Sequence, residues 1–439
     1  MYNYIIKGGQ PVTGHIKNLG AKNFATKAMI ASLLAKETTV LMNVPNIGDV
    51  LITQEMLASV GVKASWNGDK LELDTSRVNN AFVPLPNSGS NRMPILLLSV
   101  LLHRLGEAHV PSVGGCNIGE RPVNFHLKAA EMFGAIIKVD EQGYHAYKKN
   151  SLTSCHYKLP FPSVGATETC LFLGVLAKGT SVIDNVAIEP EIVSLITMLN
   201  AMGGEIKLNP NRQLVIHGVE ELSPTTFHVL GDRIEAASWA SLAAATNGQI
   251  TISGIEPTTL INFFAPFNAV GGGVKIEDPT TITFFRKKKL KSTLIETDVY
   301  PGFATDWQQP FAIMLTQAEG TSVIHETVYE KRFDYLNDLS LLGVRSQIEN
   351  HCLGSVDCRY TGRDYPHCAL IMGSTSLRSE GFNLQIPDLR AGLAYLVAAA
   401  IAEGETTLTS IEKIERGYGD LSRRLENVSL LLEKRPTFI

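Results

Sequence analysis

The sequence predicts an α/β protein of two lobes, each built from three copies of one repeated unit, in which sheets surround buried helices. Three observations support this prediction. A pattern of an apolar helix, a Gly or polar stop, a Thr- and Val-rich strand and a second helix occurs six times along the 439 residues. The stops recur at intervals of roughly seventy residues, which is typical of a repeat architecture. The first helix of most copies is apolar on nearly every side, which indicates burial.

Each copy contributes two helices in a regular order. The first helices are expected at 25–34, 95–105, 166–177, 234–245, 306–316 and 389–402. The second helices are expected at 50–60, 123–133, 191–202, 260–270, 332–342 and 418–432. Such a unit cannot cover its own apolar faces, so copies must pack together. We expect a first lobe of residues 22–230 and a second lobe of residues 1–21 and 231–439, with a site in the cleft between them.

Composition excludes several classes of protein. The formal net charge of −4 gives no sign of a partner such as nucleic acid. The chain has no apolar run of membrane-spanning length and no apolar segment after a basic start at its N-terminus, so we expect a cytoplasmic protein with no membrane partner. No phosphate-binding loop or dinucleotide motif follows a strand, which argues against ATP hydrolysis and nicotinamide chemistry. We expect no cofactor, and the sequence leaves the oligomeric state open.

The last repeat is longer than the others, with an apparent insertion over residues 350–385. This segment contains His351, Cys352, Cys358, His367 and Cys368, whose residue types suit zinc. Neither C-x-x-C nor H-x-x-x-H spacing is present, so a surface insertion is favoured over a structural metal. In a reducing compartment the six cysteines of the chain are expected to be free thiols.

A glycine-rich loop at 114–122 reads G-G-C-N-I-G-E-R-P and carries Cys116. Its glycines allow the backbone to approach a ligand, and a thiol in such a loop is accessible. Arg121 could lower the pKa of that thiol and make it a useful acid or nucleophile. The alternative is a glycine-rich connection that happens to hold a cysteine.

Polar residues stand at the start of the buried helices. Helix N-termini present unpaired N–H groups and partial positive charge, so several of them facing one cleft would form an anion site. Lys22, Arg92, Arg121 and Arg416 would add full charges for phosphate or carboxylate. Asp306 is a candidate base, and Cys116 is a candidate acid or nucleophile. For an isolated Asp at a helix start, an N-cap remains the simpler interpretation.

Short motifs along nearly the whole chain carry a resemblance to a known family. They are G-A-K-N at 20–23, G-G-C-N-I-G-E-R-P-V at 114–123, P-S-V-G-A-T at 162–167, E-P-E-I-V at 189–193, D-R-I-E at 232–235, Y-P-G-F-A-T-D at 300–306, E-T-V-Y-E at 326–330, D-L-R-A-G at 388–392 and I-E-R-G-Y at 414–418. On these motifs the chain resembles the enolpyruvyl transferases, and most closely the branch that acts on UDP-N-acetylglucosamine in peptidoglycan synthesis. The resemblance implies an inside-out α/β barrel in two lobes, with the Cys116 loop of the first lobe as a lid.

The resemblance also implies the reaction and its residues. The 3′-hydroxyl of UDP-N-acetylglucosamine adds to C2 of phosphoenolpyruvate while C3 is protonated, and phosphate then leaves. Asp306 would deprotonate the hydroxyl, and Cys116 would protonate C3 or carry a covalent adduct. The phosphate and carboxylate would be held by Lys22, Arg121 and Arg416, with Asn23 at the reacting centre and Asp388 and Arg390 ordering the pocket. Contacts to the nucleotide sugar would come from Arg92, Arg121, Pro122, Val123, Asn124, Phe125, Phe161, Pro162, Ser163, Val164 and Val328.

Some positions depart from the family pattern. Asn124 stands where the family usually has Asp, Met93-Pro94 follows Arg92 in place of Ala-Ser, and Phe24 to Lys27 replaces a smaller, more apolar run. These departures concern the acceptor, so the alternative is an enolpyruvyl transferase for a different nucleotide or sugar nucleotide in secondary metabolism. A repeat scaffold that binds a nucleotide without catalysis is a third class, and the shikimate-pathway branch is disfavoured because it lacks the lid cysteine.

Overall fold

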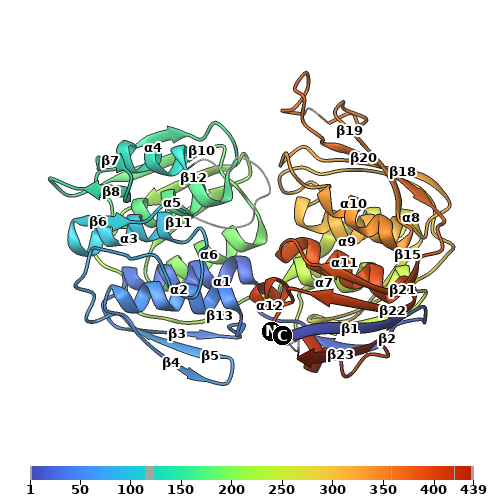
Figure 1. Ribbon diagram of the computed structural model, residues 1–439. Helices are drawn as coiled ribbons and strands as arrows, with labels where there is room; N and C mark the ends of the chain where they lie inside the picture. The colour runs from blue at the N-terminus through green and yellow to red at the C-terminus, as the bar shows by residue number, and fades with distance from the viewer. Residues whose placement is uncertain (1, 114–122, 357, 420, 437–439) are drawn as a thin grey trace. The chain divides into compact units, whose positions relative to one another are not determined.

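The computed structural model describes residues 2–113, 123–356, 358–419 and 421–436 (Figure 1). The described residues form two compact units. One unit contains residues 2–19 and 231–436, and the other contains residues 20–113 and 123–230. The chain therefore passes from one unit to the other near residues 19–20 and 230–231.

The central helices of the 20–230 unit are α1 (Lys22–Ala31), α3 (Pro94–Leu105) and α5 (Val164–Gly174), and α3 packs against both of the others. They are buried because most of their residues are small or apolar, such as the fully buried Ala25, Leu97 and Leu171. The second helices are α2 (Gly48–Ser59), α4 (Asn124–Met132) and α6 (Pro190–Ala201). All six lie where the repeat pattern predicts first and second helices.

Sheets cover these helices, and the inner strands alternate buried and more exposed residues, as in β5 and β10. In one sheet the strand order is β13 (Thr226–His228), β3 (Thr38–Met42), β5 (Lys70–Asp74), β4 (Lys63–Asn67), and Leu71 and Leu73 of β5 are fully buried. A second has the order β11 (Glu205–Asn209), β12 (Gln213–His217), β10 (Thr180–Asp184), β9 (His156–Lys158). The third has the order β6 (Glu107–Val110), β8 (Gly143–Tyr147), β7 (Ile136–Asp140).

The other unit has the same organisation. Its central helices α7 (Arg233–Ala245), α9 (Gln308–Leu315) and α11 (Leu389–Ile401) pack against one another. Its further helices are α8 (Ile261–Val270), α10 (Asp334–Leu339), α12 (Glu412–Tyr418) and α13 (Leu421–Arg424). Short 3-10 turns precede or follow several of them, including Thr305–Trp307 before α9.

The N-terminal strands belong to this second unit. β1 (Tyr2–Gly8) lies between β22 (Glu403–Thr409) and β23 (Leu431–Pro436), with β21 (Arg378–Gln385) beyond β22. β2 (Thr13–Lys17) pairs in parallel with β14 (Gln249–Ser253), followed by β16 (Thr281–Arg286) and β15 (Gly272–Asp278). The third sheet has the order β17 (Leu294–Glu296), β18 (Gly320–His325), β20 (Cys368–Gly373), β19 (Arg345–Glu349).

The sixth copy differs from the prediction at its second helix. The single helix expected at 418–432 is wrong: α12 ends at Tyr418, Gly419 follows with a φ of 57°, and within this range only Leu421–Arg424 are helical, as α13. Residues 431–436 form β23 and pair with β1. Pairing with a strand from the opposite end of the chain therefore overrides the local helical pattern at residues 431 and 432.

The apparent insertion at 350–385 is also shorter than expected. Its second half supplies β20 and β21, so irregular backbone is confined to the segment between β19 and β20. Figure 1 shows this segment at the end of the β18–β20–β19 sheet. In the described part of the chain, every helix is too short or too polar to cross a membrane.

Candidate active site

Asp306 lies in the 3-10 turn that begins the predicted 306–316 helix, directly before α9. Its Oδ1 lies 3.1 Å from Nη2 of Arg332, and its Oδ2 lies 3.0 Å from Nε of Arg390. Both arginine side chains are almost completely buried, whereas the Asp306 side chain is 21% exposed. The two guanidinium groups hold the carboxylate in one orientation, and its side chain is still partly exposed.

Arg390 is held in turn by the start of α11. Asp388 is the N-cap of this helix and accepts hydrogen bonds from the backbone N–H groups of Arg390 at 2.7 Å and Ala391 at 3.1 Å. The Arg390 Nη1 donates to the Tyr418 hydroxyl at 2.6 Å. Burial opposes the charge of Arg390, but the neighbouring Asp306 and Tyr418 raise its pKa well above the ordinary value. The N-cap interpretation of Asp388 is therefore confirmed, and the cap also positions a ligand of Asp306.

Arg332 and Glu326 link Asp306 to the Val328 segment. Arg332 Nη2 also donates to the Thr305 carbonyl at 2.9 Å, and the Thr305 hydroxyl donates to Glu326 Oε2 at 2.8 Å. The other oxygen of the buried Glu326 accepts from the backbone N–H of Val328 at 2.9 Å. One buried network thus places both Asp306 and Val328, two residues that the sequence assigns to the site.

In the 20–230 unit, Lys22 and Asn23 occupy the first two positions of α1. The Lys22 Nζ lies 2.8 Å from Oδ2 of Asp49, a nearly buried residue in the first turn of α2. The pair anchors the Lys22 ammonium group, and the side chain as a whole is 17% exposed. This places a cation at a helix N-terminus, as an anion site requires.

Lys27 lies farther along α1 and interacts electrostatically with Glu168 of α5. Burial lowers the pKa of Lys27, and burial raises the pKa of Glu168 to about 7. Further acidic neighbours of Lys27 are Asp49 and Glu191. The departure from the family pattern at residues 24–27 therefore has a charged counterpart in a neighbouring buried helix.

The starts of α4 and α5 lie together. His126 of α4 is buried, and its Nδ1 lies 2.7 Å from the Thr169 hydroxyl of α5. Burial, with a smaller contribution from the charge of Arg92, lowers the pKa of His126 to about 3. Ser163 is the N-cap of α5 and accepts from the Ala166 N–H at 3.4 Å.

This contact groups most of the residues expected to contact the nucleotide sugar. Asn124 and Phe125 open α4, Val164 opens α5, and Phe161 and Pro162 directly precede the Ser163 cap. Asn124 is exposed, Val123 is buried, and Phe161, Pro162, Ser163 and Val164 are half-buried. Arg92 precedes α3 and is close enough to influence His126.

Three of the expected site residues belong to the glycine-rich loop at 114–122. Cys116, Arg121 and Pro122 lie outside the described residues. Arg416 lies in the last turn of α12, in the same helix as Tyr418.

Sequence reasoning missed four partners of the site residues: Asp49, Glu326, Arg332 and Tyr418. Glu326 and Tyr418 stand inside the recognised motifs E-T-V-Y-E and I-E-R-G-Y, which is the signal that could have found them.

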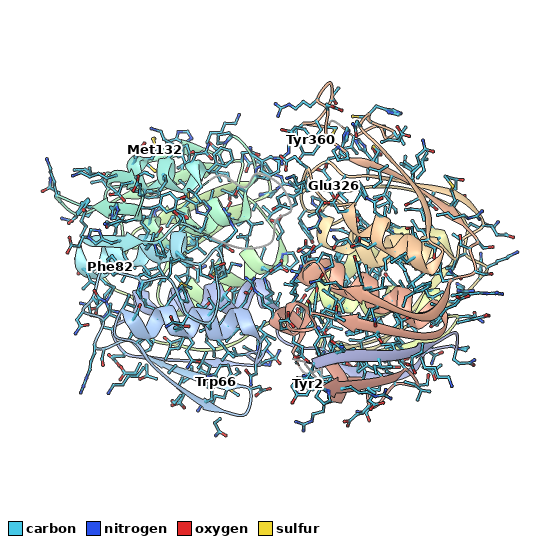
Figure 2. The ribbon with its side chains drawn as sticks, in the orientation of Figure 1. Tyr2, Trp66, Phe82, Met132, Glu326 and Tyr360 are labelled. Atoms are coloured by element: carbon cyan, nitrogen blue, oxygen red, sulfur yellow. The ribbon has the colours of Figure 1, made fainter. Side chains whose placement is uncertain are left out.

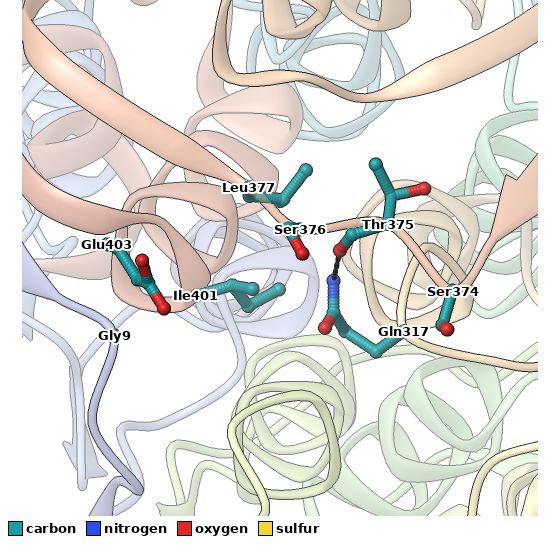
Figure 3. Close-up of a pocket in the computed structure, with 8 residues that line it drawn as sticks. All are labelled: Gly9, Gln317, Ser374, Thr375, Ser376, Leu377, Ile401 and Glu403. Carbon is teal, nitrogen blue, oxygen red and sulfur yellow. Dashed lines mark hydrogen bonds between the residues drawn. The ribbon is translucent and has the colours of Figure 1, made fainter.

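A small hollow elsewhere in the second unit is not part of this site (Figure 3). It is lined by Gly9, Gln317, Ser374, Thr375, Ser376, Leu377, Ile401 and Glu403, and the Gln317 amide donates to the Thr375 carbonyl at 3.1 Å. Gln317 follows the C-terminal end of α9, and Ile401 ends α11. The hollow is therefore at the opposite ends of the two helices whose starts carry Asp306 and Arg390.

Comparisons with known proteins show which family the chain resembles. The family model for EPSP synthase (3-phosphoshikimate 1-carboxyvinyltransferase) matches residues 6–425. The UDP-N-acetylglucosamine 1-carboxyvinyltransferase of Protochlamydia amoebophila is 42% identical over 442 residues, covering 98% of this chain and 94% of that protein. The protein of the same name from Chlamydia abortus is 42% identical over 416 residues, covering 94% of this chain and 93% of that protein.

Solved structures share the α/β fold. The enolpyruvyl transferase NikO from Streptomyces tendae superposes with a TM-score of 0.85 at 22% identity, covering 100% of this chain and 99% of that one. The EPSP synthase of Acinetobacter baumannii superposes with a TM-score of 0.75 at 18% identity, covering 99% of this chain and 100% of that one. The family model matches nearly the whole of this chain, and two relatives are 42% identical to it. The chain therefore belongs to the enolpyruvyl transferase family.

Proposed function

We propose that this enzyme transfers the enolpyruvyl group of phosphoenolpyruvate to the 3′-hydroxyl of UDP-N-acetylglucosamine and releases inorganic phosphate. This is the first committed step of peptidoglycan precursor synthesis, and we assign it to the cytoplasm. The names of the relatives at 42% identity support this acceptor. The observation that carries the chemistry is the accessible Asp306 carboxylate, held between the buried guanidinium groups of Arg332 and Arg390.

The fold that goes with this function is an inside-out α/β barrel of six repeated units, three in each lobe. We assign residues 22–230 to the first lobe and residues 1–21 and 231–439 to the second. The support is the common plan of the two units, in which buried central helices are covered by sheets. Such a plan leaves the helix starts free to carry polar groups.

Asp306 is the base of the proposed reaction. As it takes the proton of the 3′-hydroxyl, the sugar oxygen bonds to C2 of phosphoenolpyruvate and C3 receives a proton. Loss of a C3 proton then restores the double bond as phosphate leaves C2. Arg332 and Arg390 orient the Asp306 carboxylate, and preorganisation of this kind lowers the barrier more than an unrestrained side chain would.

The other expected residues complete the proposal. Cys116 supplies the proton to C3 or carries a covalent phosphoenolpyruvate adduct, and Lys22, Arg121 and Arg416 neutralise the phosphate and carboxylate. The Lys22–Asp49 pair supports this role, because it holds the ammonium group at the start of α1 without burying it fully. The helix starts around Arg92, Asn124 and Ser163 serve the nucleotide sugar, as does Val328.

The first prediction tests this function directly. The full chain is incubated with phosphoenolpyruvate and UDP-N-acetylglucosamine, and phosphate release is followed together with the mass of the sugar nucleotide. We expect phosphate release that needs both substrates and a product heavier by one enolpyruvyl group. Asp306→Asn, which keeps the size of the side chain but cannot act as a base, should lower kcat by roughly 100- to 10,000-fold.

Other acceptors provide the contrast. Turnover with a different nucleotide and none with UDP-N-acetylglucosamine would support the alternative acceptor, to which the Asn124 departure points. Turnover with 3-phosphoshikimate would place the enzyme in the branch named by the family model. Ligand binding without phosphate release from any acceptor would show a nucleotide-binding scaffold and would refute the proposal.

A further inference from the structure

Four metal-ligating side chains meet at the end of the β18–β20–β19 sheet. His325 ends β18, His367 directly precedes β20, and two cysteines come from the segment between β19 and β20. Their donor atoms all lie within 4.8 Å of one another. Both histidines are fully buried and both cysteines are half-buried. We call this group the Cys2His2 cluster: His325, Cys352, Cys358 and His367.

The imidazole rings are oriented as ligands. The His325 Nδ1 lies 3.2 Å from Glu296 Oε1, while its Nε2 is buried and has no hydrogen-bond partner among the described residues. The His367 Nδ1 lies 2.6 Å from the Tyr365 carbonyl, and its Nε2 lies 3.3 Å from the Cys352 Sγ. A carboxylate or carbonyl on one nitrogen fixes the tautomer that leaves the other nitrogen free to bind a metal. A buried nitrogen without a partner costs stability unless a ligand occupies the position beside it.

The type and number of these donor atoms, and the distances between them, fit zinc. Zn²⁺ takes four Cys and His ligands in a tetrahedron, with bonds that place neighbouring donors about 3.3–3.8 Å apart. The Cys352–His367 separation already has this value, and the full cluster needs only small side-chain movements to reach it. We propose that the Cys2His2 cluster binds one structural zinc ion. Binding deprotonates the two thiols and releases two protons, which leaves a site of no net charge.

Glu296 joins the two parts of the cluster. Besides contacting His325, its Oε1 accepts hydrogen bonds from the backbone N–H groups of Ser355 at 2.6 Å and Val356 at 2.8 Å. A Cβ on Gly354 would lie 1.9 Å from that same oxygen, so the loop backbone is packed directly on the Glu296–His325 pair. One carboxylate thus orients a histidine ligand and holds the loop that carries both cysteine ligands, as outer groups do at zinc sites.

The zinc site also reaches the Val328 segment. The His367 carbonyl accepts the Glu326 N–H at 2.7 Å, and Arg359, beside Cys358, donates to the Val328 carbonyl. Figure 2 shows Glu326 and Tyr360 on the same side of this unit. A metal that fixes this loop therefore stabilises a segment assigned to the sugar nucleotide. This consequence rests on the proposed function, whereas zinc binding itself does not.

Spacing in the sequence favoured a surface insertion because one ligand, His325, comes from a strand outside the 350–385 segment. The sheet register brings it there, since His325 and Cys368 are paired residues of β18 and β20. A disulfide between Cys352 and Cys358 is the competing use of the two thiols. It would leave both histidine nitrogens without a partner in the cluster.

The second prediction tests for the metal in the full-length chain, purified under reducing conditions without chelator from zinc-supplemented cells. We expect about one zinc per chain by elemental analysis, and after exchange with Co²⁺ the absorption bands of a tetrahedral thiolate site. Cys352→Ser should lose the metal and the bands. Glu296→Gln keeps all four ligands and should weaken zinc binding about 10- to 100-fold in a chelator competition.

Cys155→Ser is the matched control, because Cys155 is a half-buried free thiol in the other unit, and it should retain the metal. The Co²⁺ spectrum of the unaltered protein keeps the test decisive if a variant does not fold. Reduced protein that neither carries zinc nor gives thiolate–Co²⁺ bands refutes the proposal, whatever its enolpyruvyl transferase activity. Metal that survives Cys352→Ser also refutes this ligand set.

Discussion

Asp306, the proposed base, shows how neighbouring residues orient a carboxylate. A carboxylate that contacts a single arginine can still rotate about that contact. Each oxygen of Asp306, however, contacts a different guanidinium group. Arg332 holds it from the side of the Thr305 carbonyl, and Arg390 holds it from the start of α11. Burial disfavours the charge of Arg332, but the carboxylates of Asp306 and Glu326 raise its pKa above the ordinary value. The arginine charge is therefore permanent, and the geometry of the carboxylate depends on the shape of the guanidinium group.

The third prediction concerns that shape. Arg332→Lys retains the positive charge but cannot reach both the Thr305 carbonyl and the Asp306 carboxylate from one planar group. We expect kcat to fall about 10- to 100-fold, because a misplaced base costs rate in proportion to its displacement. KM for both substrates should change little, since Arg332 is a positioning residue. Steady-state kinetics of phosphate release measure both parameters.

Arg345→Lys is the control for this substitution. Arg345 is an exposed residue of β19, and its replacement should leave kcat unchanged. An Arg332→Lys enzyme with wild-type kcat would show that the position of Asp306 does not depend on this contact. A fall confined to KM would assign Arg332 to substrate binding instead.

At the level of elements, the α4–α5 contact depends on an uncharged histidine. His126 is 7% exposed, and a Cβ on Gly165 of α5 would lie 2.9 Å from its Nε2. There is no room for water around a charged ring on that side, so burial lowers the pKa of His126 from its ordinary value of 6.5 to about 3. The two helices that present Asn124 and Ser163 are therefore coupled through a group that resists protonation.

The fourth prediction follows from this lowered pKa. Below pH 6.5 the unfolded chain binds a proton at His126 and the folded chain does not, so stability is complete above pH 6.5 and decreases as the pH falls toward 3. Between pH 7 and pH 5 the wild type should lose about 2 kcal/mol of unfolding free energy through this group. His126→Gln, whose amide can still bond to Thr169, should lack that share of the loss. Urea unfolding at the two pH values measures it.

His228→Gln serves as the control, because His228 lies exposed on β13 of the same unit. Its dependence of unfolding free energy on pH should match that of the wild type. Equal pH dependence in the His126→Gln variant and the wild type would show that His126 takes up its proton without unfolding.

At the level of the molecule, the second unit is built around helices of small residues. Helix α7 consists largely of Ala and Ser and packs against both α9 and α11. Close approach of three buried helices requires such residues, because larger side chains would force the axes apart. This packing positions the polar helix starts at Asp306 and Asp388. The packing of the core therefore determines where these two residues of the candidate site lie.

The fifth prediction tests the close packing. Ala240 is fully buried in α7, and Ala240→Leu adds three carbon atoms where no space is expected. The free energy of unfolding should fall by about 1–3 kcal/mol, as measured by urea denaturation. Ala58→Leu, at an exposed position of α2, should change it by less than about 0.5 kcal/mol. A stable Ala240→Leu variant would reveal a cavity beside α7.

Local patterns in the sequence determined much of this protein. The repeat, the buried helices and the polar residues at their starts were all predictable, because helix periodicity and capping depend on residues within a few positions. The motifs indicated the family, and through the resemblance they pointed to Asp388 and Arg390. The helix expected at 418–432 failed because Gly419 adopts a positive φ after α12 and because residues 431 and 432 pair with β1 from the other end of the chain.

Only the tertiary structure decided which side chains meet. Arg332 is 26 positions from Asp306, and Asp49 contacts Lys22 across two helices. His325 joins Cys352, Cys358 and His367 only because β18 pairs with β20 in one register. Such contacts depend on how buried surfaces pack and strands align, and no pattern of nearby residues encodes that choice.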